Sequence, residues 1–576
     1  MAVWLLLGLL SIAAAMCLLL PRLSATEHLA DGSSGPGYPL WLVWVGGTNR
    51  LELDLQAGPL TPKRWSVAVE GRLTALRING HEVPSHDLLP DGPADTWRSF
   101  VLDTSPWLNR GANHIDLVIE NDSGTDPLRP TGGVSFLPVP GWRLLLMWAG
   151  FLPWLLALSS LFRLRREQIL VLAFALEILC MYCWGTPWNL RSHDVMLAKG
   201  GHVGYITYIA SHLALPLPTQ GWTFYHPPLY YIVGAAAWRL AQALALPPPP
   251  VLQWLSLALW LVFLTASAAA LRLTLRLSPP LLALATAALA LWPCGVIQSV
   301  TIGNDVALYA SAAVATWFLL RWWRSGSRLQ LLGAAGFVVV SLLCKSNGIV
   351  PAAALGLLAV LRLLHSPDRR RWIDTAMAAA MVGTGAVLSL AVRLYYYWRG
   401  ELGDWLIANA NGLPDTLRVP VHLGNFLLLP ADLKTFLVTP WLDSFDDASG
   451  RANFWISLMR SALSGEFTFT SENARLIALL WGALLLGLML LPLRAVARCT
   501  RPQLWRDAPL LALGLLWLAS LLALRIRVPY ACSNDFRYIL PVLLPFLVGA
   551  ARSGMPARWA LSGMVLSSPL FFIAVA

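Results

Sequence analysis

Long apolar runs alternate with short polar segments along most of this 576-residue chain. The longer runs match the roughly 20 residues that a helix needs to cross a hydrocarbon core about 30 Å thick. We therefore predict a polytopic α-helical membrane protein of about 12 to 14 spans. Beyond residue 140 the candidates are 143–162, 168–186, 224–246, 251–272, 279–297, 304–321, 329–346, 348–364, 372–392, 474–493, 508–525, 537–551 and 557–576.

One further apolar run opens the chain, from Met1 to Leu20, and Arg22 follows it. No positive residue precedes the run, and Leu23-Ser24-Ala25 is a poor match to a signal-peptidase site. We expect residues 1–22 to be a retained signal-anchor span.

Residues 25–140 have a different pattern, in which apolar and polar positions alternate with a period of two. Leu51–Leu55 and Trp65–Val69 alternate in this way, and 114–121 is another strand candidate. A short apolar segment leads into Asn79-Gly80, a pair that favours a β-hairpin turn. Short strands separated by turns predict a β-sandwich in this region.

Composition supports a membrane protein, because 57% of residues are hydrophobic and only 13% are charged. The net charge of +11 does not indicate nucleic-acid binding, because arginines account for most of the positive charge and lie in short loops between apolar runs. Such loops face the cytoplasm by the positive-inside rule. These arginines are Arg163, Arg165, Arg166, Arg321, Arg324, Arg328, Arg369, Arg370, Arg371, Arg494, Arg498, Arg501, Arg552 and Arg558.

This orientation places residues 25–140 outside, together with the loops 187–223 and 393–473. Three apolar runs, 224–246, 251–272 and 279–297, then lie between two external points, where an even number of crossings is required. One of the three must be interfacial or re-entrant, and the sequence does not say which.

Ionisable residues collect on the external side of this topology. They include Asp194, Asp305, Lys345, Asp535 and Arg537. A charge at the edge of a bilayer is costly and usually has a functional reason. The segment 191–231 adds the histidines His193, His202, His212 and His226.

Several motifs in this order resemble membrane glycosyltransferases of the GT-C superfamily, in the branch that holds protein mannosyltransferases and the aminoarabinose transferases of lipid A. The resemblance covers about 168–551. Its motifs are Asp194 with His202, Tyr205 and Leu215-Pro216, then Tyr225-His226-Pro227-Pro228, Ser299–Asp305, Lys345-Ser346-Asn347-Gly348 and Asp535-Phe536-Arg537-Tyr538. The strand order between residues 76 and 121 is similar to a galactose-binding-like jelly roll, a sugar-binding module that accompanies many glycosidase domains.

Two positions depart from that family pattern. Many relatives have an Asp-Glu or Asp-Asp pair in the first loop, whereas here His193 precedes Asp194. Many sugar-lipid users have a lysine before the Pro-Pro pair, whereas here the residue is His226.

The resemblance implies an inverting transferase that takes a sugar from a polyprenyl-phosphate donor at the outer face of a bacterial-type cytoplasmic membrane. The acceptor hydroxyl would belong to a glycan, a lipid or a protein. Asp194 would be the general base and Asp305 a second catalytic carboxylate. Substrate and phosphate would be bound by His193, His202, Tyr225, His226, Lys345, Arg537 and Tyr538. No cofactor is expected, and a divalent ion between the two carboxylates has no support.

Each charged candidate also has a structural interpretation. Asp194 can cap a helix, and Asp305 can stabilise a helix N-terminus through the macrodipole. Lys345 can snorkel from the end of a span, and Arg537 can pair with Asp535. Loop 393–473 is rich in aromatic residues, which suits either sugar stacking or an interfacial belt.

Two other functional classes stay open. The first is a non-enzymatic lipid-linked glycan transporter or assembly scaffold whose sandwich binds sugar, although the inverted repeats of many transporters are absent. The second, weaker alternative is an acyltransferase, for which the chain has no convincing histidine-centred motif.

Overall fold

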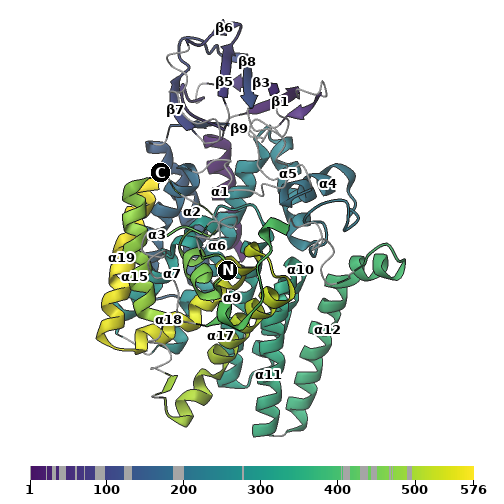
Figure 1. Cartoon of the computed structure of the whole chain (residues 1–576), viewed down its shortest axis with the longest axis vertical. Helices are drawn as coiled ribbons and strands as arrows, with labels where there is room; N and C mark the ends of the chain where they lie inside the picture. The colour runs from purple at the N-terminus through teal and green to yellow at the C-terminus, as the bar shows by residue number, and fades with distance from the viewer. Residues whose placement is uncertain are drawn as a thin grey trace.

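A computed structural model describes most of the chain. The described residues are 2–20, 22–28, 34–37, 47–58, 61–70, 72–84, 98–121, 133–139, 141–185, 200–275, 278–366, 368–403, 405, 415–427, 439–442, 450–465, 467, 469, 471–489, 496–497 and 499–575. A β-sandwich lies at one end of a large helical bundle (Figure 1). We call this end of the bundle the sandwich end.

The N-terminal strands form two antiparallel sheets. The six-stranded sheet has the order β2-β1-β3-β8-β5-β6, and the three-stranded sheet has the order β7-β4-β9. The strands are β1 (Leu23–His28), β2 (Ser34–Gly37), β3 (Gly47–Ala57), β4 (Arg64–Glu70), β5 (Arg72–Ile78), β6 (His81–Glu82), β7 (Arg98–Asp103), β8 (Gly111–Asn121) and β9 (Gly133–Pro138).

The alternating pattern explains why the two sheets pack face to face. Leu53 and Leu55 on β3 and Leu117 on β8 are fully buried against Val67 on β4. Side chains on a strand point to opposite faces in turn, so every second residue reaches this shared core. The predicted strands around residues 51–55, 65–69 and 114–121 are therefore confirmed.

The predicted hairpin at Asn79-Gly80 is also confirmed, between β5 and β6. Asn79 has φ 52° and Gly80 has φ 80°, the left-handed pair that a type I′ turn requires. The Asn79 side-chain amide donates to the Asn113 Oδ1 at 2.9 Å and to the Trp107 carbonyl at 2.8 Å. The hairpin is thus tied to the start of β8, on the neighbouring strand.

Ten helices are long and apolar enough to cross a membrane, within the residues that the structure describes. They correspond to α1 (Ala2–Leu19), α2 (Trp142–Leu161), α3 (Arg166–Gly185), α6 (Pro248–Thr274), α9 (Asn304–Ser325), α11 (Ile349–His365) with the preceding turn η3 (Ser346–Gly348), α12 (Arg369–Trp398), α15 (Glu472–Met489), α17 (Arg501–Arg527) and α19 (Met555–Val575). The chain is therefore a multi-pass membrane protein by these criteria.

Three shorter segments also run between the two ends of the bundle. They are α10 (Arg328–Cys344), the interrupted pair α7 (Pro279–Ala290) and α8 (Pro293–Gln298), and the pair η9 (Phe536–Val542) and α18 (Leu543–Arg552). The predicted span 279–297 is broken at Leu291-Trp292, and the predicted span 537–551 has a non-helical residue at Ile539. The expected total of about 12 to 14 crossings depends on these three segments.

The apolar run at 224–246 does not form a spanning helix. Only α5 (Leu229–Ala243) is helical there, and its 15 residues are too short. Leu246, just after α5, packs with Leu20, which joins α1 to the first strand of the sandwich. The segment therefore stays at the sandwich end, and this removes the odd crossing that the sequence left unassigned.

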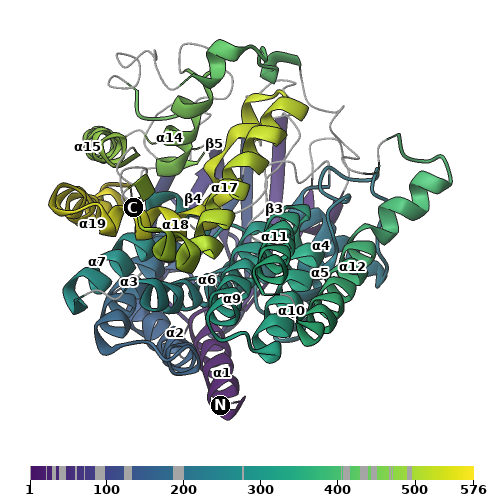
Figure 2. The same cartoon turned by 90° about the horizontal axis from the view of Figure 1, so that it is seen from below.

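Arginines gather at the opposite end of the bundle, which we call the arginine end. Arg272, at the end of α6, interacts electrostatically with Arg163, Arg165 and Arg321. At the same end Arg552 donates to the carbonyl of Thr274 at 2.9 Å. Seen from this end, α6 and α9 lie near the middle of the bundle, while α12 stands at its edge (Figure 2).

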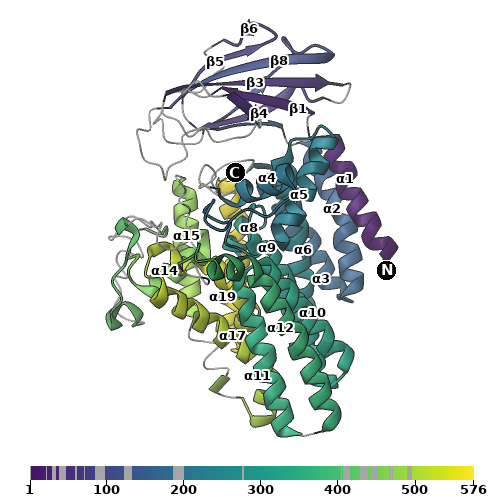
Figure 3. The ribbon, with the colours of Figure 1, turned by 90° about the vertical axis from the view of Figure 1, so that its right-hand side faces the viewer.

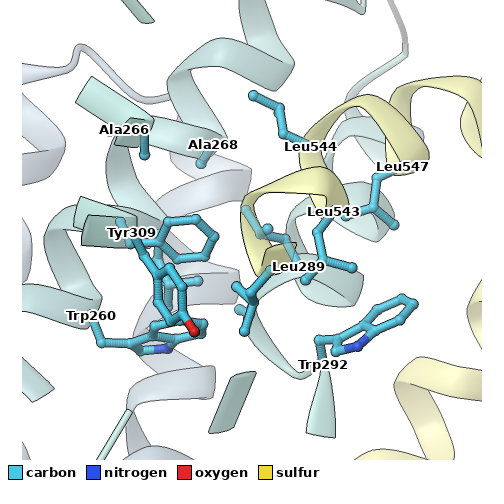
Figure 4. Close-up of a cluster of buried hydrophobic side chains, with 14 of the residues drawn as sticks. Trp260, Ala266, Ala268, Leu289, Trp292, Tyr309, Leu543, Leu544 and Leu547 are labelled. Carbon is cyan, nitrogen blue, oxygen red and sulfur yellow. The ribbon is translucent and has the colours of Figure 1, made fainter. Parts of the chain in front are cut away.

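The centre of the bundle is an apolar layer in which α6, α7, α9 and α18 meet. Trp260, Tyr309 and Leu289 are all fully buried there, next to Leu543 and Leu547 (Figure 4). Such close packing fixes the ends of the helices that enter this layer. The end of α7 and the start of α18, where two of the interrupted segments are broken, lie here.

Candidate functional site

His193 and Asp194 lie outside the described residues. The structure does describe the other candidate side chains, which come from five segments of the chain, and a sixth segment, α12, adds a residue that the sequence did not predict. These segments are α4 (His202–His212), the turn before α5, and the sandwich-end termini of α9, α10, α12 and η9, and a side view shows α4 and α5 between the sandwich and the spanning helices (Figure 3).

Lys345 and Asp305 form a buried ion pair. The Lys345 Nζ lies 2.5 Å from the Asp305 Oδ1, and the two residues are only 5% and 7% exposed. Two unpaired charges at this depth would be strongly disfavoured, so each depends on the other. The second candidate carboxylate, Asp305, therefore has a direct partner in the candidate phosphate ligand Lys345.

The Lys345-Ser346-Asn347-Gly348 motif is the turn that brings these residues together. Helix α10 ends at Cys344, whose carbonyl accepts a hydrogen bond from the buried Asn304 amide at 3.1 Å. A Cβ at Gly348 would lie 2.5 Å from the Leu342 nitrogen, so the chain can double back on α10 only with glycine there.

A second ion pair comes from the beginning of η9. The Asp535 Oδ1 accepts the backbone N–H of Arg537 at 2.9 Å, and the Asp535 Oδ2 lies 3.4 Å from the Arg537 Nε. Tyr309 anchors this turn from α9, because its hydroxyl donates to the Arg537 carbonyl at 2.5 Å. Tyr309 follows Asp305 by one helical turn, so α9 positions both ion pairs.

The Tyr538 ring connects the two pairs. The Lys345 Nζ lies 5.1 Å from the ring centroid and the Arg537 guanidinium carbon 5.2 Å from it, both within the range of a cation–π interaction. The Tyr538 carbonyl also accepts a hydrogen bond from the Asn347 amide at 3.3 Å. Two predicted motifs that are 190 residues apart in sequence thus meet at one place.

The histidines form a stacked group beside these charges. His202 Nδ1 and the Tyr231 hydroxyl are hydrogen-bonded at 2.7 Å, and the ring of His202 stacks on that of His226 with centroids 5.8 Å apart. Tyr225 packs against His226, with ring centroids 4.2 Å apart. The ring of His202 also lies next to Gly303, one residue before α9.

Arg393 belongs to this group, and the sequence analysis missed it. It lies inside α12, is 3% exposed, and its Nη2 approaches the Ser346 hydroxyl at 3.4 Å. It also exerts an electrostatic effect on Tyr205 and His226. A cation inside an otherwise apolar run was the available signal, but the predicted span stopped at residue 392, and α12 continues to Trp398.

The surroundings of His226 keep its ring neutral. Burial lowers the pKa of His226 well below its ordinary value, and the charges of Lys345, His202 and Arg393 lower it further. A neutral ring can donate one hydrogen bond and accept another without adding a charge. The Nδ1 of His226 is buried and has no hydrogen-bond partner among the described residues.

The site therefore contains three cations and two carboxylates in the part of the chain that the structure describes. The cations are Lys345, Arg393 and Arg537, and the carboxylates are Asp305 and Asp535. Their sum is one excess positive charge, which suits an anionic ligand with a single charge. Within the described residues, no three His, Cys, Asp or Glu side chains are placed to hold a metal ion.

Comparison with protein-family models and with curated proteins finds no match for this chain.

Proposed function

We propose that the protein is an inverting glycosyltransferase that uses a polyprenyl-phosphate sugar as donor. The observation that carries the proposal is the group of Lys345, Arg393 and Arg537 at the sandwich end of the bundle, of which Lys345 and Arg393 are buried. A sugar phosphodiester of a polyprenol carries a negative charge that these side chains can bind.

The membrane location supports a lipid-linked donor. Nucleotide sugars are absent outside the cytoplasm, so an activated sugar must reach an external site on a lipid. The arginine end would face the cytoplasm by the positive-inside rule, which would place the sandwich and the cation group outside. The proposed location of the active site is therefore the external face of a bacterial-type cytoplasmic membrane.

The reaction would be a single displacement. The acceptor oxygen forms a bond to the anomeric carbon while the bond from that carbon to the phosphate oxygen breaks. The electron pair of the broken bond stays on the lipid phosphate, and Asp194 takes the proton of the acceptor hydroxyl. One carboxylate base is enough, because inversion needs no covalent sugar intermediate.

The cations would act on the leaving group. The phosphate gains a second negative charge as the sugar departs, and fixed positive charges stabilise this change. Arg537 and Arg393 offer bidentate donors, whereas Lys345 acts as a point charge. Asp305 and Asp535 would hold Lys345 and Arg537 in place before the donor arrives.

The histidine group would bind the sugar or the phosphate as neutral donors. His226 lies beside the cations as a neutral ring with His202 stacked on it, and Tyr225 and Tyr538 offer aromatic faces next to them. Stacking against a sugar ring is a usual role for such faces. No step of this proposal needs a metal ion.

Binding of a labelled polyprenyl-phosphate sugar to the purified protein in detergent tests the proposal. The wild type should bind it, and the Lys345→Gln/Asp305→Asn double variant should bind it at least about tenfold more weakly, since one charge-assisted contact is lost. Binding without any transfer to sugar, lipid or peptide acceptors would favour the transporter or scaffold alternative. Absence of binding to the wild type would contradict both.

A further inference from the structure

The arginine end carries a second cationic group, far along the helices from the candidate site. Arg163 and Arg165 lie in the turn between α2 and α3, Arg272 in the last turn of α6, and Arg321 and Arg324 near the end of α9. Arg272 is repelled by Arg163, Arg165 and Arg321. These arginines are spread over some 160 positions of the sequence, and only the fold brings them together.

Carboxylates of the described residues do little to neutralise four of these five arginines. Arg165 lies 3.7 Å from Glu167, a loose contact between partly exposed side chains. Arg163, Arg272 and Arg321 form no ion pair with any carboxylate in the described part of the chain. Holding Arg163, Arg272 and Arg321 near one another with no carboxylate partner among the described residues is costly, so an anion from outside would relieve the repulsion.

A cavity of about 380 Å³ opens beside this group. Its walls come from the end of α6, the end of α9 and the start of α10. The lining residues are Leu273, Arg321, Arg324, Ser325, Ser327 and Gln330. The side-chain oxygen of Gln330 is buried and has no hydrogen-bond partner among the described residues.

Contacts with neighbouring groups hold two arginines beside the cavity. The Arg321 guanidinium lies 4.6 Å from the centroid of the Trp317 ring, which fixes its direction. Behind it the Arg362 Nη1 donates to the carbonyls of Trp322 and Trp323 at 2.8 and 2.6 Å. These bonds satisfy the free carbonyls at the end of α9 and bring another positive charge close by.

We propose that this cavity binds the phosphate headgroup of an anionic phospholipid from the adjacent leaflet. Guanidinium groups match phosphate oxygens in pairs, and basic pockets between helix ends are known to hold acidic lipid headgroups. Leu273 in the wall and the 73% exposed Leu329 on α10 offer apolar surface for the start of an acyl chain. The positive-inside rule accounts for arginines in these loops, but it does not require them to converge on a cavity.

Lipid titration of the full-length protein in neutral detergent tests this site, with the thermal melting temperature as the readout. We expect phosphatidylglycerol or cardiolipin to raise the melting temperature of the wild type and phosphatidylcholine to leave it unchanged. The Arg321→Gln/Arg324→Gln variant should need at least about tenfold more anionic lipid for the same effect. The matched control is Arg369→Gln/Arg370→Gln, which removes two exposed arginines at the start of α12 and should respond like the wild type.

Three results would overturn the proposal. They are an unchanged response of Arg321→Gln/Arg324→Gln, an equal loss in the control variant, and an equal effect of inorganic phosphate on the wild type. The second would indicate general surface electrostatics, and the third a soluble anion. If the glutamine variant does not fold, Arg321→Lys/Arg324→Lys keeps the charge but loses the paired donors, and it should bind the lipid more weakly than the wild type. The site is separate from the transferase proposal, because none of its residues belongs to the cation group at the sandwich end.

Discussion

At the scale of single residues, the candidate site consists of paired charges that support one another. Lys345 and Asp305 are nearly inaccessible to solvent and lie 2.5 Å apart. A pair of this kind adds little net stability, because burial of both charges offsets much of their attraction. Loss of one partner is a different matter, since the other then remains buried without compensation.

Lys345→Gln alone should therefore lower the free energy of unfolding by about 3–5 kcal/mol. Lys345→Gln/Asp305→Asn should recover most of that loss, because no unpaired charge remains. Thermal melts in detergent, followed by size-exclusion chromatography, measure both effects. Additive losses in the double variant would show that the two side chains do not act as a pair.

His226 makes stability depend on pH. Its pKa is lowered in the folded protein by burial and by the nearby Lys345, His202 and Arg393. Below about pH 6.5 the His226 side chain binds a proton in the unfolded chain but not in the folded protein. The free energy of unfolding therefore falls as the pH falls. The contribution of the neutral His226 ring to stability is therefore fully present above about pH 6.5 and decreases below it.

His226→Gln should remove part of this dependence. Between pH 7.5 and 5.5 the melting temperature of the wild type should fall more steeply than that of the variant. His81→Gln, on the exposed hairpin of the sandwich, provides the matched control. Parallel curves for the wild type and His226→Gln would mean that this ring does not resist protonation.

The sequence indicated many of these residues and the pairing of Arg537 with Asp535, but not the pairing of Lys345 with Asp305. Asp305, Lys345 and Arg537 stand out because charge is rare in apolar runs. The pairing of Lys345 with Asp305 depends on the start of α9 lying beside the end of α10 and on the glycine turn at Gly348, and no local pattern encodes that. Arg393 was missed because the edge of a predicted span was placed one residue too early.

At the scale of elements, strands were easier to predict than helix breaks. Period-two alternation and an Asn-Gly pair are local signals, and they gave β3, β4, β8 and the hairpin. The breaks in α7–α8 and η9–α18 have only weak local signals, namely Pro293 and Pro541. The short α5 looked like a span because apolar residues continue on both sides of its 15 helical positions.

The sandwich should fold without the membrane domain. Its buried side chains form a core of their own, separate from the core of the bundle. Expressed as residues 23–139, it should give a β-type far-UV circular dichroism spectrum and a cooperative melt. A disordered product would mean that the sandwich requires the helices beneath it.

Asn113→Ala should destabilise this isolated sandwich by about 2 kcal/mol, since it leaves a buried hydrogen-bond network incomplete. Asn113 is buried, accepts from the Asn79 amide at 2.9 Å and from the Asn109 backbone at 2.7 Å, and donates to two carbonyls. His81→Ala on the exposed β6 is a suitable control. Chemical denaturation of the three proteins gives the comparison.

At the scale of the whole molecule, the two ends of the bundle differ in charge and in chemistry. The arginine loops lie at one end, and the sandwich and the candidate site lie at the other (Figure 1). The positions of the arginines in the sequence predict this separation. They do not predict which helices surround the site, because helix neighbours are set by tertiary packing.

Cysteine labelling with a membrane-impermeant reagent in intact cells tests the orientation. In a background without native cysteines, His81→Cys on the sandwich should react and Arg369→Cys at the start of α12 should not. Both positions are exposed, so access to the reagent is matched. Reaction at residue 369 alone would reverse the topology and place the candidate site in the cytoplasm.

Transfer of labelled sugar from a polyprenyl-phosphate donor by the purified protein tests the central claim most directly. The wild type should transfer the sugar with inversion at the anomeric carbon. Asp194→Asn should still bind the donor but turn over about 10²–10⁴-fold more slowly, the usual loss when a general base is removed. Full activity with asparagine at 194 would reject this base, and no transfer by a folded wild type that binds the donor would contradict the transferase account.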